Sequence, residues 1–347
     1  MRHGYHILYL GTALIVAVIL GFAPSNVLVT DLHTKPAVAA KSKHPPAAAV
    51  CRGVQVYPSQ DLASVANSKP PGTTFCVNDG HYYVSQNVSV QSKDEFIGVN
   101  SDSTKPEVEG TGAEHIFHTK GSNGAHIANL AISGAVGGDY CEPNCGRGIG
   151  GGGENLTVEN VRAYNNPNSG IGGAGSNLVV RNSTFDHNGS PSFARDGGPV
   201  SSAGIKSVNS MYIYNSRFID NYWTGVWCDM ECGAFAVHDS TIIGNGKAGI
   251  HYEISTGPTV LEGSVVRHNG GSPQASSTRN AGILLTGSSG AYAYGNKLGG
   301  NAKHGILIAA DSRTGGSISK VTIRGNAMKS DTIKGCNVPG VTCASNR

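Results

Sequence analysis

Short segments that alternate apolar and polar residues recur along most of the chain. NLTVENV, NLVVRNS, MYIYNSR and AFAVHDS each alternate β-branched or aromatic residues with polar ones, and asparagine and glycine separate them. Such alternation predicts short strands of about four to five residues, each with one buried face. The pattern therefore predicts an all-β protein built from many short strands.

From about residue 124 the sequence repeats itself. A Gly-Ile or Gly-Val dipeptide opens each copy, at intervals of 21 to 24 residues except across two insertions, 190–202 and 271–280. A period of this length that holds about three short strands describes one coil of a parallel β-solenoid. The dipeptides begin at Gly148, Gly170, Gly204, Gly225, Gly249, Gly282 and Gly305.

Asparagine marks the same repeat at two further places. One series precedes each dipeptide, and a second lies in the middle of each copy, where Gly263 interrupts it. Asparagines that recur once per coil are expected to stack as ladders at tight turns. The first series is Asn166, Asn188, Asn221, Asn245, Asn269 and Asn301, and the second is Asn160, Asn182, Asn215, Asp239, Asn296 and Asn326.

The pattern G-I-x-x-x … N-x-x-V-x-x-N … N-x-G resembles the right-handed parallel β-helix family, the pectin-lyase-like superfamily with its bacterial β-helix repeat proteins. The resemblance covers roughly residues 75–330 and implies a single right-handed β-helix, with SQDLASVA (59–66) as a short capping helix. The superfamily includes polysaccharide lyases, glycoside hydrolases, epimerases, esterases and surface proteins, so the fold does not fix an activity. The expected parts are an N-terminal cap and first coil over 51–110, the β-helix over 111–330 and a disulfide-closed tail over 331–347.

Two glycine runs match the dinucleotide-binding fingerprint G-x-G-x-x-G. They are GIGGGG (148–153) and GIGGAG (170–175). In dinucleotide-binding folds the motif occurs once, between a strand and a helix. Here it recurs one period later and a strand pattern follows it each time. We therefore interpret both runs as part of the repeat.

The N-terminus carries the features of a targeting segment. Arg2 precedes an uncharged apolar run from Ile7 to Ala23. This run predicts export, with residues 1–30 as a signal peptide or a signal anchor. Residues 31–50, rich in proline and alanine, form a linker. We expect the protein to be secreted or anchored at the outer face of the cell membrane, with this segment as its only membrane contact.

Eight cysteines, all after the linker, agree with export because disulfides persist in oxidising compartments. Three pairs are close in sequence, which leaves the remaining two cysteines for each other. A zinc site is the alternative, although no C-x-x-C motif or matching set of histidines accompanies the cysteines. The expected pairs are Cys141 with Cys145, Cys228 with Cys232, Cys336 with Cys343, and Cys51 with Cys76.

Composition supports the same class of protein. The 49 glycines and the low fraction of charged residues, 14%, suit a turn-dense β protein better than a helical one. A net charge of +3, without a basic tract that contains aromatic residues, argues against nucleic-acid binding. We expect a monomer whose partner is a polysaccharide.

Counting from each dipeptide glycine assigns the residues to faces. The first residue after it is always β-branched and points inward, so positions +2 and +4 point outward. Met230 and Ile254, apolar at position +5, extend the inward series. Charged and aromatic residues then gather on one outer face in three consecutive coils. They are Lys206, Trp227, Asp229, His251 and Glu253.

Asp229 and Glu253 are expected side by side, since adjacent coils lie about 4.8 Å apart. Two adjacent carboxylates repel each other, and a shared proton, a bound cation, or Lys206 and His251 would relieve the repulsion. The two insertions leave from the corner before this strand, one on each side of the patch, which predicts a groove. In the structural alternative the pair is solvated and Asp229 stabilises the turn between Cys228 and Cys232.

Two chemistries compete for this groove. In a lyase, Asp229 and Glu253 hold a divalent cation such as Ca²⁺, and Lys206 or His251 removes the proton next to a uronate carboxylate. In a glycoside hydrolase, one carboxylate is the general acid and the other is the nucleophile or base. No other cofactor is indicated.

Three further residues are candidates for substrate binding. Trp227 could stack against a sugar ring, since a flat apolar ring covers a sugar face. Arg195 and Arg279, in the two insertions, could bind substrate carboxylates. The alternative to an enzyme is a non-catalytic cell-surface module that binds glycans or another partner along the solenoid.

Overall fold

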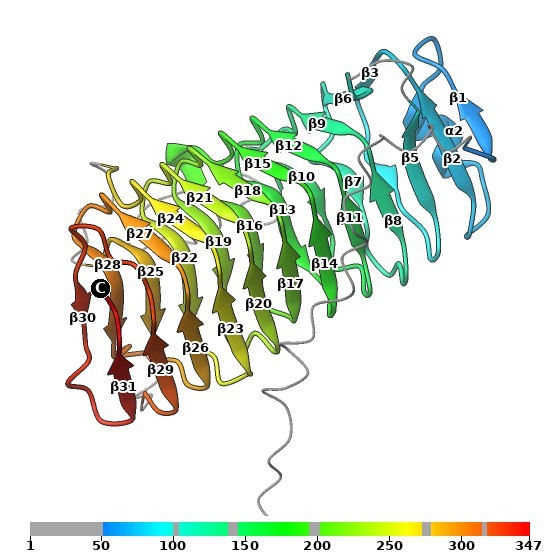
Figure 1. Ribbon diagram of the computed structural model, residues 1–347. Coiled ribbons are helices and arrows are strands. Elements are labelled where there is room, and N and C mark those ends of the chain that lie inside the picture. The colour runs from blue at the N-terminus through cyan, green and yellow to red at the C-terminus, as the bar shows by residue number, and fades with distance from the viewer. Residues whose placement is uncertain (1–50, 100–103, 138–144, 194–201, 273–278, 314–317) are drawn as a thin grey trace, which may run out of the picture.

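Three parallel β-sheets run along the length of the molecule and enclose one core (Figure 1). The structure, a computed structural model, describes residues 51–99, 104–137, 145–193, 202–272, 279–313 and 318–347. From β2 to β29 each coil contributes one strand to each sheet in turn, so neighbours in a sheet are three strands apart in chain order, and the spacing is shorter only at the two ends. The all-β solenoid predicted from the repeat is confirmed.

Each sheet can be followed along the chain by its strands. The twelve-stranded sheet contains β1 (Val54–Val56), β2 (Thr74–Asn78), β5 (Glu95–Val99), β8 (His126–Ala128), β11 (Thr157–Glu159), β14 (Leu178–Arg181), β17 (Met211–Tyr214), β20 (Phe235–His238), β23 (Thr259–Glu262), β26 (Ala291–Tyr294), β29 (Val321–Arg324) and β31 (Val341–Ala344). The ten-stranded sheet contains β4 (Val88–Ser89), β7 (His115–His118), β10 (Arg147–Gly150), β13 (Ser169–Ala174), β16 (Ala203–Ser207), β19 (Thr224–Cys228), β22 (Ala248–Glu253), β25 (Ala281–Thr286), β28 (His304–Ala309) and β30 (Ile333–Lys334). The nine-stranded sheet contains β3 (His81–Val84), β6 (Glu107–Gly110), β9 (Ala131–Ser133), β12 (Arg162–Tyr164), β15 (Thr184–Asp186), β18 (Arg217–Ile219), β21 (Thr241–Ile243), β24 (Val265–Arg267) and β27 (Lys297–Gly299).

A short helix, α2 (Leu62–Asn67), packs at the N-terminal end of the coils (Figure 1). The Asp61 side chain caps it by accepting a hydrogen bond from the backbone N–H of Ala63, at 3.0 Å. Leu62 is buried against the first coil. This is the helix expected at SQDLASVA. A 3₁₀ turn, η1 (Pro191–Phe193), lies in the first insertion.

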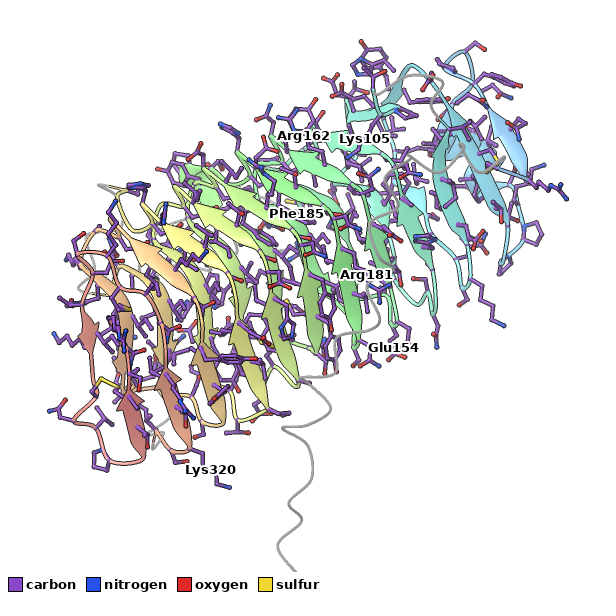
Figure 2. The ribbon with its side chains drawn as sticks, in the orientation of Figure 1. Lys105, Glu154, Arg162, Arg181, Phe185 and Lys320 are labelled. Carbon is purple, nitrogen blue, oxygen red and sulfur yellow. A yellow bond between two sulfur atoms is a disulfide. The ribbon has the colours of Figure 1, made fainter. Side chains whose placement is uncertain are left out.

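The β-branched residue after each dipeptide glycine points inward, as predicted. These residues pair in register along the ten-stranded sheet and are fully buried, so they form one wall of the core. Phe185 and Phe218 stack in the same interior with ring centroids 5.2 Å apart. Charged side chains such as Arg162 and Arg181 lie on the outer surface (Figure 2). The buried series is Ile149, Ile171, Ile205, Val226, Ile250, Ile283 and Ile306.

The expectation that Met230 and Ile254 continue the inward series is wrong. Met230 is 60% exposed, and both residues have left-handed backbone, with φ of 48° and 47°. Strand alternation therefore ends before this position. The chain turns there, and in a turn an apolar residue need not point toward the core.

The first asparagine series forms a buried ladder. The side-chain amide of Asn188 donates to Asn221 at 3.1 Å, Asn221 donates to Asn245 at 2.9 Å, and Asn245 donates to Asn269 at 2.9 Å. Each oxygen also accepts the backbone N–H of the asparagine in the preceding coil. Because every amide is satisfied inside the protein, the ladder ties the coils together at this corner.

The second series splits into two different positions. Asn215 and Asp239 have φ of 47° and 48°, and Gly263 takes the same left-handed place with φ of 63°. Gly263 therefore continues the series instead of interrupting it. Asn296 belongs to the next position, where it accepts the backbone N–H of Ser264, as Ser264 does from Ser240.

Three of the expected disulfides are present. They join Cys51 to Cys76, Cys228 to Cys232 and Cys336 to Cys343. Cys141 lies outside the described residues, so its expected pairing with Cys145 stays a prediction. Six of the eight cysteines are therefore engaged in disulfides and are not thiolate ligands for zinc.

The predicted targeting segment (1–30) and linker (31–50) lie outside the described residues. From Cys51 onward, none of the helices in the described ranges is long and apolar enough to span a bilayer.

Candidate active site

The outward column predicted at position +2 follows the ten-stranded sheet. Lys206 on β16 pairs in register with Trp227 on β19, Trp227 pairs with His251 on β22, and His251 pairs with Leu284 on β25. Lys206, Trp227 and His251 are therefore stacked on three consecutive coils. Strand register alone brings together residues that are more than forty positions apart in sequence.

Both faces of the Trp227 ring are covered by its neighbours in this column. The Lys206 Nζ lies 3.7 Å from the ring centroid, and the His251 ring stacks on the indole with centroids 5.3 Å apart. The indole Nε1–H donates a hydrogen bond to Glu253 Oε2 at 2.9 Å. Trp227 is only 5% exposed. This packing does not fit the sugar-stacking role expected for Trp227, because a sugar could reach only the ring edge.

Asp229 follows β19 directly and forms an ion pair with Lys206. The Lys206 Nζ lies 3.1 Å from Asp229 Oδ2. Burial raises the pKa of Asp229, although the nearby Lys206 opposes the rise. Burial likewise lowers the pKa of Lys206, opposed by Asp229. The two pKa values are thus displaced toward each other, which favours proton transfer between the groups.

The other oxygen of Asp229 is buried without a partner. Asp229 Oδ1 accepts no hydrogen bond from any described residue, although Asp229 is only 5% exposed. An unsatisfied buried carboxylate oxygen is costly, so a native protein that keeps one calls for an explanation such as a catalytic role, a water molecule or an ion. The atom is placed to accept a hydrogen bond from a ligand.

Glu253, at the end of β22, is held from several sides. Oε2 accepts the Trp227 hydrogen bond, and the Arg313 guanidinium contacts Oε1. The register places Asp229 beside Glu253 on the next coil, since Cys228 pairs with Tyr252 and the backbone N–H of Met230 donates to Glu253 O at 3.1 Å. Each carboxylate nevertheless has its own cation, Lys206 for Asp229 and Arg313 for Glu253. The expected repulsion is relieved by these ion pairs.

Arg313 and Asp311 belong to the site but have no place in the sequence prediction. They follow β28, in the turn that leads to β29. Asp311 Oδ1 accepts from Arg313 Nε at 3.0 Å, and Asp311 Oδ2 accepts from Arg279 at 3.1 Å. Asp311 therefore binds both guanidinium groups, and it holds that of Arg313 against Glu253. The only sequence signal is an acidic and a basic residue two positions apart, which is too common to single out.

His251 lies beneath this cluster. It is 2% exposed, and its Nε2 lies 2.9 Å from Thr286 Oγ1. Burial lowers the pKa of His251 well below its usual range, so the imidazole is neutral near pH 7. Its Nδ1 lies 3.9 Å from Glu253 Oε2. His251 supports Trp227 and Glu253 from behind and lies too deep to meet a polymer directly.

The carboxylates do not fit the expected calcium site. Calcium takes six to eight oxygen ligands, mostly from carboxylates and carbonyls. Here Asp229 and Glu253 already face Lys206 and Arg313, so a divalent cation would have to displace two ion pairs. The cations of this site are side chains of the chain itself.

The Cys228–Cys232 disulfide closes the turn that carries Asp229. Its Cα atoms are 5.6 Å apart, and both cysteines are buried. The backbone N–H of Asp229 donates to Ser207 O at 3.0 Å, which continues the strand ladder past β19. The disulfide and this hydrogen bond together fix the direction of the Asp229 side chain.

The two insertions enter the fold where the sequence places them. The described end of the first leads into β16 and that of the second into β25, so both join the corner before the ten-stranded sheet. Residues 194–201 and 273–278 lie outside the described residues, and Arg195 is among them. The role expected for Arg195 and the walls of the groove therefore stay predictions.

We name the assembled residues the acid–base cluster. It lies on the outer face of the ten-stranded sheet and combines buried carboxyl groups with more exposed guanidinium groups. Its members are Lys206, Trp227, Asp229, His251, Glu253, Arg279, Asp311 and Arg313.

Comparison with known proteins agrees with the fold. The family model described as "Right handed beta helix region" matches residues 53–281. No curated protein sequence matches the chain. Among solved structures, the A-module of the Azotobacter vinelandii mannuronan C-5 epimerase AlgE4 superposes with a TM-score of 0.54 at 11% sequence identity, covering 86% of this chain and 92% of that one.

Two further solved structures show weaker similarity. The alginate lyase from Paenibacillus sp. str. FPU-7 has a TM-score of 0.40 at 12% identity, covering 84% of this chain and 97% of that one. PfbA, a surface adhesin of Streptococcus pneumoniae, has a TM-score of 0.45 at 13% identity, covering 85% and 90%. At these identities the likeness concerns the fold alone.

Proposed function

The chain belongs to the right-handed β-helix family, and on that premise we propose that it is an exported enzyme that acts on an acidic polysaccharide at the acid–base cluster. The reaction we propose is removal of the proton next to a uronate carboxylate, as in a polysaccharide lyase. The observation that carries the proposal is the buried Lys206–Asp229 pair with its unpartnered Asp229 Oδ1.

Export is supported by the disulfides. Three are present in the described residues, and disulfides form and persist mainly in oxidising compartments. Together with the apolar N-terminal segment, they support a protein that is secreted or anchored at the outer face of the membrane. A large extracellular polymer is a suitable substrate for a solenoid with one long open face.

The preference for an acidic polymer rests on the distribution of charge. The carboxyl groups of Asp229 and Glu253 are almost fully buried, whereas the Arg313 side chain is 57% exposed and that of Arg279 is 37% exposed. A polymer that approaches this face meets the guanidinium groups first. Guanidinium groups recognise carboxylates by paired hydrogen bonds, so Arg279 and Arg313 would neutralise a uronate carboxylate.

Lys206 would act as the base of the reaction and Asp229 as its acid. Burial lowers the pKa of Lys206, so its neutral amine is more accessible as a base. Burial raises the pKa of Asp229, so its protonated form is more accessible as an acid. Lys206 would remove the proton from C5 of the uronate, and Asp229 would protonate the leaving glycosidic oxygen at C4. The C4–O bond breaks and a C4–C5 double bond forms.

A hydrolase mechanism is supported less well. It would require Glu253 to attack the sugar or to activate water while Asp229 acts as the acid. Both Glu253 oxygens already engage side chains of the protein, Oε1 with Arg313 and Oε2 with Trp227. Glu253 is therefore better suited to hold Arg313 in place than to act as a nucleophile.

One fold neighbour is compatible with this chemistry, since it is named as a mannuronan C-5 epimerase. Epimerisation at C5 and β-elimination both begin with loss of the same proton, and they diverge only at the next step. A non-catalytic module that binds glycans or another partner along the solenoid is the alternative outcome of the test.

The test is a product assay with the purified chain. Acidic and neutral polysaccharides are incubated with it, and unsaturated uronates, new reducing ends and C5-inverted residues are measured separately. We expect unsaturated uronates from an acidic polymer only. Reducing ends without unsaturation would replace the lyase by a hydrolase, inverted residues would indicate an epimerase, and binding without any product would identify a non-catalytic module.

A further inference from the structure

The two glycine runs of the sequence lie on the same outer face as the acid–base cluster. Gly150 on β10 pairs in register with Gly172 on β13, and Gly172 pairs with Lys206 on β16. On the other side, Gly150 pairs with His118 on β7. The column therefore continues beyond Lys206 toward the N-terminus, and its next two positions are glycines without side chains. We call these two positions and the adjoining Gly151 and Gly173 the glycine trough.

Arg147 lies across this trough. Its Nη1 donates a hydrogen bond to Gly172 O at 3.2 Å. A Cβ atom added to Gly172 would lie 2.6 Å from Arg147 Nε, and one added to Gly150 would lie 3.0 Å from Arg147 Cδ. Any other residue at these positions would push the guanidinium away. The two glycines therefore leave the room that Arg147 occupies along this face.

Two neutral polar groups point into the same trough. His115 Nδ1 lies 2.9 Å from the site of a Cβ on Gly150, and Ser169 Oγ lies 2.5 Å from that on Gly172. His115 is 7% exposed and Ser169 is fully buried, yet neither atom has a hydrogen-bond partner in the described part of the chain. Buried polar atoms without partners in a native protein call for a ligand or water.

The charge states suit an anionic sugar. Burial lowers the pKa of Arg147 to about 10, so the guanidinium stays charged near neutral pH. Burial, together with Arg147 and His118, lowers the pKa of His115 to about 4, so this imidazole is neutral there. One partly buried cation beside a neutral imidazole and a hydroxyl can bind a carboxylate or sulfate together with the hydroxyl groups of the same sugar.

The trough connects two other features of this face. A cavity of about 430 Å³ lies at its N-terminal end and is lined in part by His118 and Lys120. Gly151 adjoins both, because a Cβ there would lie 2.6 Å from the His118 ring and 2.9 Å from Lys120 N. At the other end Gly172 adjoins Lys206. From His118 to Lys206 the column takes three strand steps, about 14 Å at about 4.8 Å each.

From these observations we infer that the glycine trough is a second binding site, in which Arg147, His115 and Ser169 take an anionic sugar residue of a polymer whose reacting residue lies at Lys206. This inference rests on the proposed function and extends it. The polymer would lie along the β-helix axis, with its chain running from the acid–base cluster toward the N-terminal coils. Chains long enough to cover both places should bind more tightly than short ones.

The experiment measures binding as a function of chain length. Oligogalacturonate and oligomannuronate dimers and hexamers are titrated calorimetrically against the chain in a Lys206→Gln background, which removes the proposed base. Sulfated and neutral hexamers serve as separate arms and distinguish a carboxylate from a sulfate ligand. The variants are Arg147→Gln and Gly172→Ala, the second of which fills the trough without removing a charge.

Matched controls lie away from the glycine trough. Arg181, labelled in Figure 2, is a partly buried arginine on β14 of the twelve-stranded sheet, and Arg181→Gln removes the same charge away from this face. Gly299→Ala is the glycine control, since a Cβ there meets nothing closer than 3.5 Å. Thermal unfolding of every variant verifies that the fold is intact.

The inference predicts that Arg147→Gln and Gly172→Ala weaken hexamer binding about tenfold and change dimer binding less than twofold, while both controls bind as the parent does. Equal hexamer binding by parent and Arg147→Gln would overturn the second site and leave the proposed function intact. Weaker hexamer binding by the variants, with no product from the chain that retains Lys206, would support the second site and overturn the proposed reaction. If no anionic hexamer binds the parent, both the second binding site and the proposed function are overturned.

Discussion

Lys206 and Asp229, from adjacent coils of the β-helix, form an ion pair with Nζ 3.1 Å from Oδ2, and both side chains are largely withdrawn from solvent. Such a pair has little value as a stability device, because removing two charges from water costs about as much as their attraction returns. A repeat fold could place serine or threonine at both positions. The pair is explained more readily by chemistry, since burial displaces the pKa values of its two members toward each other.

Replacing Glu253 tests whether it anchors Arg313. Glu253→Gln keeps the size of the side chain but removes the charge that Arg313 contacts. We expect unfolding free energy to fall by about 1–3 kcal/mol and product formation to fall at least tenfold. Denaturant unfolding and the product assay measure the two effects.

Glu262→Gln is the control for this change. Glu262 lies on β23 of the twelve-stranded sheet, in the same coil, and pairs with His238 at 3.1 Å. We expect it to leave product formation unchanged. If Glu253→Gln also leaves the activity unchanged, Glu253 and Arg313 have no part in the reaction.

Removing divalent cations should have no effect. Lys206 and Arg313 already face the two carboxylates, so the proposed reaction needs no calcium. The assay is run with and without a chelator, and equal rates are expected. Loss of activity in the chelator, restored by Ca²⁺, would show that our assignment of the cationic role to arginine side chains is wrong.

Acidification should weaken the site through Asp311. Hydrogen bonds from Arg313 hold the pKa of Asp311 well below its usual range. A carboxyl group with a lowered folded-state pKa contributes stability above its unfolded pKa and loses it as the pH falls below about 4. Asp311→Asn should therefore be less stable than the parent at pH 7, and the difference should shrink toward pH 2. Unfolding measured across this range tests the prediction, and a constant difference would contradict it.

The asparagine ladder and the left-handed turn positions should respond differently to substitution. Asn221 is buried and its amide bonds both neighbouring coils, so Asn221→Ala should cost about 3 kcal/mol. Asn215 has φ of 47°, which glycine adopts freely, so Asn215→Gly should change stability by about 0.5 kcal/mol or less. Denaturant unfolding compares them, and equal losses would contradict the distinction.

The sequence is sufficient to place Lys206, Trp227 and His251 in one column. The side-chain period of a strand is two and the coils stack in register, so counting from the Gly-Ile dipeptide gives the outward positions directly. The same counting fails at Met230, where the strand has ended, and at Asn296, where glycine and asparagine both occupy left-handed positions and the phase becomes ambiguous.

Arg313 and Asp311 could not be predicted in this way. They lie in a turn outside the repeat pattern, and Arg313 reaches Glu253 across sixty residues of sequence. The orientation of the Trp227 ring could not be predicted from the sequence, because it depends on Lys206 and His251 covering both ring faces. The place of Arg147 could not be predicted either. The repeat accounts for the glycine runs, and no sequence pattern indicates that an arginine side chain lies across them.

We propose that Lys206 removes a proton from the sugar, and a nuclear magnetic resonance experiment follows that proton. An acidic polysaccharide that the chain binds is incubated in D₂O with the parent chain, with Lys206→Gln and with Lys334→Gln, an exposed lysine in the same outward column. We expect loss of the C5 proton signal with the parent and with Lys334→Gln, and at least a hundredfold slower loss with Lys206→Gln. Loss of the signal at equal rates in all three, or new reducing ends with the C5 proton retained, would contradict it.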